Sequence, residues 1–177
     1  MLAEAMCRYP RRRTCCLWTM EKSNIAFWFS SEVDATHRTL RYDLNLEALL
    51  IGHEAGLTDL NWSPSTPKQP PLLLSTSSDN SLIIWSPSAS ASISKDGVWV
   101  SEHRFGSIGG RGLAFYGARW GKDGSSVLAS GWNGGWERWV KETDEERWDA
   151  KAGLTGHFGE VRSVSWDPRG DYLLSVG

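Results

Sequence analysis

The chain consists of short apolar runs of strand length, separated by turns of Gly, Asn, Asp and Pro. The segment from Gly52 to Trp85 shows this arrangement most clearly. Its strand-length runs occupy residues 57–62, 72–78 and 81–85, with turns at Ser63-Pro64 and Asp79-Asn80. Runs of four to eight residues bounded by such turn residues are typical of β-strands. We therefore predict three strands for this segment.

The same order of elements returns twice further along the chain. The second copy occupies residues 115–120, 127–131 and 135–139, and the third occupies residues 161–166 and 172–176. The tryptophans that end the first run of each copy, Trp62, Trp120 and Trp166, are 58 and 46 residues apart. A period of about 40–45 residues, lengthened by loop insertions, resembles that of WD40 repeats. The insertions here are a proline-rich loop at 65–71 and a serine-rich loop at 86–96.

Strand composition and turn chemistry agree with blades of a β-propeller. A four-stranded blade buries both faces against its neighbours, which selects apolar runs such as residues 72–74 and 82–84. Turns between strands need Gly, Asn or Asp. They are predicted at Asp79-Asn80, Asp123-Gly124, Asn133-Gly134 and Arg169-Gly170. The predicted fold class is therefore all-β, built from WD40 β-propeller blades.

The repeats divide the chain into two parts. Residues 46–177 are the WD40 repeat region, and residues 1–45 are an unassigned leader or the remnant of a preceding blade. Seven blades of about 40–45 residues need more than the 177 residues present. We therefore expect an incomplete propeller of about two blades plus part of a third. Its open faces and sheet edges are expected to associate when the chain is alone.

Composition and charge exclude several classes of function. The 19 basic and 21 acidic side chains leave a net charge of −2, which gives no overall electrostatic footprint for nucleic acid or an anionic membrane. No apolar run approaches the roughly 18 residues that a membrane helix needs. No continuous apolar region follows the basic run Arg11-Arg12-Arg13, so a secretory signal is not expected.

The cysteines indicate a reducing compartment. The chain has an odd number of cysteines, and two of the three are adjacent: Cys7, Cys15 and Cys16. No other Cys or His lies near them at metal-ligand spacing. We expect no metal, no cofactor and no small-molecule substrate. The expected location is the cytoplasm, with the nucleus as a second compartment.

A set of polar and aromatic side chains in the repeats forms the candidate site. Its members are His53, Ser75, Ser77, Asp79, Trp85 and His157. As a bare set, Ser, His and Asp suggest a hydrolase triad. WD repeats, however, use these residue types in a buried hydrogen-bond chain that runs from the His before the first strand to the Trp ending the third. Because paired buried polar groups stabilise a sheet, we interpret the set as structural and assign no catalytic residue.

The three copies differ in how much of this chain they contain. In the first, Asp79 precedes Trp85 by six positions, as the WD-repeat chain requires, and either Ser75 or Ser77 supplies the hydroxyl. The second has Asn133 in place of the Asp and lacks a Gly-His start. The third begins with His157. The network is therefore expected to be complete only in the first copy.

Two other features bear on binding. The glycine-rich segment 106–112 lacks the Lys-Ser/Thr ending of a phosphate-binding loop, and we interpret it as a flexible loop. Trp132, Trp136 and Trp139 could form an exposed aromatic patch or pack into a blade core. Core packing is expected for Trp139, and the place of Trp136 is left open.

Several runs resemble a narrower family than WD40 repeats in general. They are residues 46–54, Gly97-Val98-Trp99, Arg104-Phe105-Gly106, Gly109-Gly110, residues 112–116, Thr155-Gly156-His157-Phe158 and residues 161–170. Generic WD repeats do not require Gly-Val-Trp, the Gly-Gly loop or Gly-His-Phe. On these runs, residues 46–177 resemble the Elongator complex protein 2 family.

That resemblance implies a non-catalytic scaffold. Members of the family resemble two propellers in tandem and act in Elongator beside a large scaffold subunit and a catalytic acetyltransferase/radical-SAM subunit. The complex installs carboxymethyl-type groups on the wobble uridine of tRNA. The implied partners are those protein subunits, with tRNA contacted indirectly, and the cofactors belong to the catalytic partner. The alternatives are a general WD40 adaptor in ubiquitin ligation or chromatin and, with less support, a hydrolase.

Overall fold

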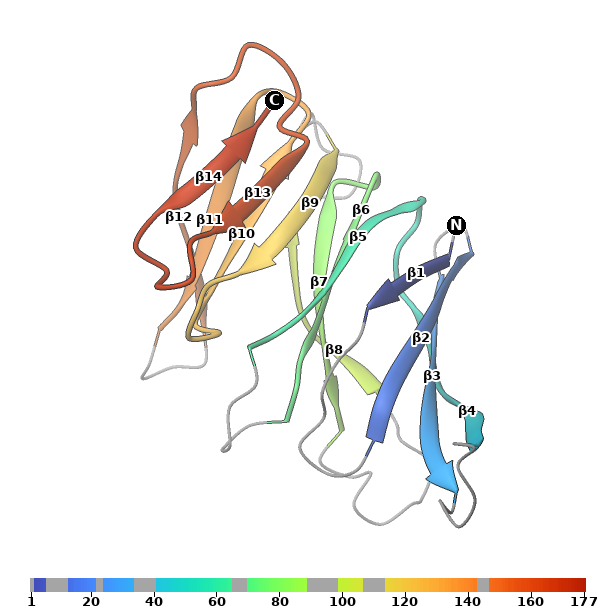
Figure 1. Ribbon diagram of the computed structural model, residues 1–177. Coiled ribbons are helices and arrows are strands. Elements are labelled where there is room, and N and C mark those ends of the chain that lie inside the picture. Colours follow the sequence, from blue (N-terminus) through green and yellow to red (C-terminus); the bar gives the residue numbers. More distant parts are fainter. Residues whose placement is uncertain are drawn as a thin grey trace. The chain divides into compact units, whose positions relative to one another are not determined.

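The structure is a computed structural model in which every regular element of the described residues is a β-strand (Figure 1). The described residues are 2–5, 13–21, 24–33, 41–64, 70–88, 99–106, 114–142 and 147–177. The strands are β1 (Leu2–Ala5), β2 (Arg13–Glu21), β3 (Asn24–Val33), β4 (Arg41–Ile51), β5 (Leu57–Trp62), β6 (Leu73–Ser77), β7 (Ser81–Pro87), β8 (Trp99–Gly106), β9 (Phe115–Trp120), β10 (Ser126–Gly131), β11 (Gly135–Lys141), β12 (Trp148–Thr155), β13 (Ser163–Trp166) and β14 (Leu173–Val176). The glycine-rich loop predicted at 106–112 lies outside them from residue 107 onward.

The strands form sheets that follow the order of the chain. The strands β1–β4, β5–β8 and β9–β12 form three four-stranded sheets, each with its strands in sequence order, and β13–β14 form a two-stranded sheet. The predicted first runs of the first two copies coincide with β5 and β9. In the third copy the strand begins at Ser163 instead of Val161. The all-β prediction of WD40-type blades is confirmed.

The predicted turns have the backbone conformation that their residue types allow. Asn80, Gly124, Gly134 and Gly170 have φ angles of 66°, 73°, 79° and 80°. This left-handed region is open to Gly and accessible to Asn, but costly for residues with bulkier side chains. The four predicted turns are therefore confirmed.

The described chain divides into two compact units. The first comprises Met1–Gly52 and Pro87–Val100, and contains the sheet β1–β4. Within that sheet, Ile25 of β3 is the register partner of Leu50 of β4, and both are buried. The domain boundary expected after residue 45 lies within β4, which pairs along its length with β3.

The second unit comprises His53–Ser86 and Ser101–Gly177. In it the sheet β9–β12 contributes to two apolar clusters. Val127 and Ala129 of β10 pack in a cluster shared with the sheet β5–β8, and the intervening Leu128 packs with Val161 and Val164 before and within β13. Because successive side chains of a strand point to opposite faces, the sheet β9–β12 lies between its two neighbours.

The three tryptophans near the turn after β10 have different environments. Trp139 is buried in the cluster shared with the sheet β5–β8, as expected. Trp136 is partly buried against the other cluster, around Leu128. Trp132 is 47% exposed, and its ring centroid lies 5.4 Å from that of Tyr116. The three rings therefore do not form one exposed aromatic patch.

Candidate functional site

The candidate residues of the first copy come together around one turn of the second unit. His53 precedes β5, Ser75 and Ser77 lie on β6, Asp79 lies in the turn between β6 and β7, and Trp85 lies on β7. The turn places Asp79 beside the loop that contains His53. Antiparallel pairing, with Leu73 opposite Trp85 and Ser75 opposite Ile83, then brings the tryptophan ring to the serine hydroxyl.

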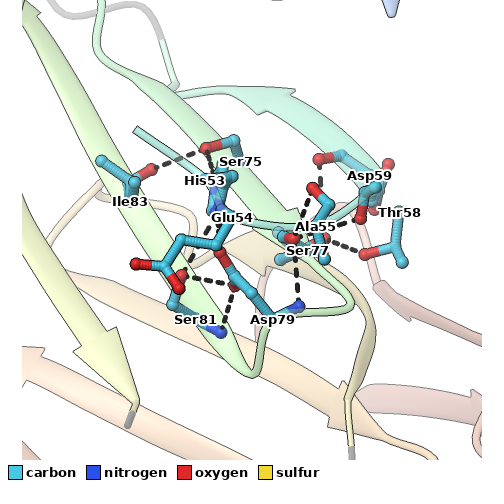
Figure 2. A network of polar contacts seen from close by, with 12 residues as sticks. His53, Glu54, Ala55, Thr58, Asp59, Ser75, Ser77, Asp79, Ser81 and Ile83 are labelled. Atoms are coloured by element: carbon cyan, nitrogen blue, oxygen red, sulfur yellow. Dashed lines mark hydrogen bonds and ion pairs between the residues drawn. The ribbon is translucent and has the colours of Figure 1, made fainter. Parts of the chain in front are cut away.

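Four of these side chains form one continuous hydrogen-bond chain. His53 Nε2 lies 2.7 Å from Ser75 Oγ, and His53 Nδ1 lies 3.1 Å from Asp79 Oδ2 (Figure 2). Trp85 Nε1 donates to Ser75 Oγ at 2.9 Å. All four residues are at most 8% exposed.

The direction of the protons in the chain follows from which groups can donate. Indole nitrogen only donates and carboxylate oxygen only accepts. His53 therefore donates from Nδ1 to Asp79, its Nε2 accepts from the Ser75 hydroxyl, and Ser75 accepts from Trp85. Every member is satisfied, which is the condition under which a buried polar network stabilises a fold.

Asp79 also organises its own turn. Its Oδ1 accepts from Ser81 N at 2.9 Å and from Ser81 Oγ at 2.6 Å. Its Oδ2 accepts from Glu54 N at 2.8 Å. Ser81 was not foreseen from the sequence, although a serine two residues after an aspartate in a tight turn is a recognisable signal.

Ser77 contacts the loop before β5 and does not contact His53 or Trp85. Its hydroxyl lies 3.1 Å from both Ala55 O and Gly56 O, and it accepts from Asp79 N at 3.1 Å (Figure 2). Of the two serines considered, Ser75 therefore joins the histidine to the tryptophan.

The pKa values of the central pair are shifted in the same direction. Burial lowers the pKa of His53 below its ordinary value of 6.5, and the charge and hydrogen bond of Asp79 offset this effect only in part. Burial alone would raise the pKa of Asp79. Hydrogen bonds from Ser81 and from the Glu54 amide, together with His53, lower that pKa below 3.8 instead. At neutral pH the pair is a neutral imidazole beside an ionised carboxylate.

The order Ser75–His53–Asp79 is that of a hydrolase triad, but its surroundings do not suit catalysis. Ser75 is completely buried, so no substrate carbonyl can reach its hydroxyl. Its oxygen already accepts from Trp85 and lies 3.4 Å from Ile83 O. A nucleophile needs an accessible oxygen next to its base. The arrangement therefore ties strands together.

The later copies retain parts of the same arrangement. His157 Nε2 lies 2.8 Å from Ser175 Oγ, which corresponds to the contact between His53 and Ser75. Asn133 Oδ1 accepts from Gly135 N at 3.1 Å and so closes its turn as Asp79 does. Neither copy shows the full chain within the described residues.

A contact between two sheets was not foreseen from the sequence. Asp59 of β5 forms an ion pair with Arg119 of β9, and it also accepts from Ala118 N at 3.3 Å. Asn61 Nδ2 donates to Ala118 O at 2.9 Å. The partners are about 60 residues apart in sequence, and only the stacking of the sheets brings them together.

Among the described residues, no group of three or more His, Cys, Asp or Glu side chains could hold a metal ion. No helix long and apolar enough to span a membrane occurs in the same residues.

Comparison with known proteins identifies the type of repeat. Residues 45–86 and 148–177 match the family model described as "WD domain, G-beta repeat". Elongator complex protein 2 of Drosophila melanogaster is 36% identical over 136 residues, which are 76% of this chain and 16% of the relative. The chain belongs to the Elongator complex protein 2 family of WD40-repeat proteins. The match over residues 45–86 includes all four residues of the hydrogen-bond chain, namely His53, Ser75, Asp79 and Trp85.

Relatives from other organisms extend the similarity of these WD40 blades. Elongator complex protein 2 of Danio rerio is 35% identical over 77% of this chain. The protein of that name from Schizosaccharomyces pombe is 30% identical over 96% of this chain and 23% of its own length. This last match extends into residues 1–45. The chain spans about a sixth to a quarter of the length of these relatives.

Proposed function

We propose that this protein is a non-catalytic WD40 scaffold subunit of an Elongator complex. The observation that carries the proposal is identity of 30–36% to relatives named as a protein of that complex, over most of the chain. The WD40 fold supports it, since repeat sheets of this kind present broad surfaces and loops to partners.

The proposed partners are other protein subunits of the complex, namely a large scaffold subunit and the catalytic acetyltransferase subunit. In this scheme the catalytic subunit holds the cofactors and acts on the wobble uridine of tRNA, where it installs carboxymethyl-type groups. The blades described here position that subunit and contact tRNA only indirectly. The net charge of −2 supports the indirect role, because it offers no general attraction for a polyanion.

The absence of catalysis in this chain is part of the proposal. The one arrangement that resembles catalytic machinery within the described residues is the buried chain through Ser75, which no substrate can approach. A complex that modifies tRNA acts where tRNA is used, so the proposed location is the cytoplasm, with the nucleus as a second compartment.

Purification and nucleoside analysis test this proposal together. The protein, tagged at its own locus, should co-purify with the large and the catalytic subunits of Elongator. Deletion of its gene should remove carboxymethyl-type wobble uridine from bulk tRNA, measured by mass spectrometry of nucleosides. The purified protein alone should not hydrolyse acetyl-CoA. An undiminished level of the modified uridine would rule out the Elongator role and favour a general WD40 adaptor.

A further inference from the structure

A cavity of about 190 Å³ lies at the start of the first strand of three successive repeats. Four positions before the aligned tryptophans, the repeats contain Thr58, Tyr116 and Arg162, and all three line the cavity. Pockets for drug-sized molecules are about 300–1,000 Å³, so this one has room for a single side chain. The Arg162 side chain is 65% exposed, so the cavity wall is accessible from solvent.

The carboxylate that lines the cavity is already paired within the protein. Asp59 Oδ1 accepts from Leu60 N at 2.9 Å, and its Oδ2 accepts from Asn61 Nδ2 at 3.1 Å and from Ala118 N at 3.3 Å. The same Oδ2 receives Arg119 Nη1. Because the charge of Asp59 is balanced by Arg119 and three donors converge on Oδ2, Asp59 does not favour a second cation as ligand.

The two arginines of the cavity wall, in contrast, have donors to spare. Arg119 directs Nη1 to Asp59 and, at 2.8 Å, to Ala118 O. Its Nε and Nη2 donate to no other described residue. Arg162 uses only Nη2, which lies 3.3 Å from Glu160 Oε1. A guanidinium has five N–H donors in a planar fork that matches a carboxylate, so the unused donors favour an anionic ligand.

An aromatic pair lies next to these charges. Tyr116 lines the cavity and its ring packs 5.4 Å from that of Trp132, which is 47% exposed. Tyr, Trp and Arg are the residue types that most often dominate the energy of protein–protein interfaces. An acidic side chain inside the cavity and an apolar neighbour on Trp132 would engage both features at once.

We infer that this cavity is the docking site for a Glu or Asp side chain of a partner protein segment. The inference rests on the proposed scaffold function and names the chemistry of one contact that this function would use. A nucleic-acid phosphate fits less well, because the cavity is smaller than a nucleotide and its wall lacks a basic stripe.

Fluorescence anisotropy with short probes tests the docking site directly. A fluorescein-labelled hexaglutamate peptide is titrated with the full chain, and hexaglutamine and hexauridylate RNA serve as comparison probes. Hexaglutamate should bind at least about tenfold more tightly than hexaglutamine, because one charge-assisted hydrogen-bonded pair contributes an affinity difference of about that size. Arg162→Gln should weaken that binding about tenfold. Ser163→Trp, which keeps the charge but fills the cavity from β13, should abolish it.

Arg169→Gln is the matched control. Arg169 is 79% exposed in the turn between β13 and β14, so its loss changes the net charge equally without altering the cavity. It should leave the affinity within about twofold. Equal binding of hexaglutamate and hexaglutamine, equal effects of the two arginine variants, or preferred binding of hexauridylate would each overturn the inference. The assay contains only the chain and a probe, so its failure is distinguishable from failure of the Elongator proposal.

Discussion

Replacing Asp79 with alanine removes the acceptor on which four hydrogen bonds converge. Two come from Ser81, one from the Glu54 amide and one from His53 Nδ1, over distances of 2.6–3.1 Å. The alanine side chain is smaller than that of aspartate and accepts none of them. The change therefore tests whether the hydrogen-bond chain contributes to stability.

The magnitude follows from which donors water can reach after the change. Glu54 is exposed, so water can replace the carboxylate at its amide, and the Ser81 hydroxyl can rotate to another acceptor. The Ser81 amide is buried and is left without a partner, while the buried His53 Nδ1–H keeps only the Ser81 hydroxyl, 3.2 Å away. An unsatisfied buried donor costs about 1–3 kcal/mol. The expected loss in the free energy of unfolding is therefore about 2 kcal/mol.

Urea unfolding followed by tryptophan fluorescence measures this loss. Asp171→Ala is the control, because Asp171 is 60% exposed and its closest ion-pair partner, Arg169, lies 3.6 Å away. It should change the free energy of unfolding by no more than about 0.5 kcal/mol. Asp79→Asn should fall between the two, since it keeps one acceptor oxygen but turns an NH₂ group toward a donor. Equal stabilities of the Asp79 and Asp171 alanine variants would refute the reasoning.

Three further outcomes are expected. The unfolding free energy should fall as pH drops from about 7.5 to about 5.5, because the pKa of His53 is lowered in the folded state and the unfolded chain takes up the proton first. Thermal melts across this pH range check it, and the pH dependence should be flatter for His53→Gln than for the wild type. Gly134→Ala should cost about 2 kcal/mol or more in urea unfolding, because φ is 79° and the new Cβ would collide with a backbone carbonyl. Gly159→Ala is the control and should be neutral, because no atom lies within 4 Å of the position that its Cβ would take. The isolated chain should self-associate through Leu174 and Val176, which are 69% and 55% exposed. Sizing chromatography should show less self-association when both residues are changed to Lys, and a monodisperse wild-type monomer would contradict the prediction.

Features that depend on neighbouring residues could be predicted from the sequence. The left-handed residues Asn80 and Gly134 were located because few residue types tolerate that conformation. The strand Leu57–Trp62 was located because its run is bounded by turn residues on both sides. Asp79 and Trp85 could be assigned to one network because their six-position spacing is that of WD repeats.

Features that depend on register or on stacking could not be predicted. Ser75 and Ser77 share one face of β6 because strand side chains alternate with a period of two, so only the pairing with β7 distinguishes them. The ion pair of Asp59 with Arg119 depends on how two sheets stack, which no local pattern encodes. Whether Trp136 is exposed or packs in a core could not be predicted for the same reason, since its cluster includes residues on β13 and β14.

The alternation of side chains along β10 determines which sheet interfaces of the second unit a change in this strand destabilises. Val127 and Ala129 contact one neighbouring sheet and Leu128 contacts the other, so β10 contributes to both interfaces of its sheet. Stability in a series of repeated sheets is approximately a sum over sheets and over the interfaces between nearest neighbours. A cavity made at Val127 weakens one interface, and a distortion of the β10 backbone weakens two at once.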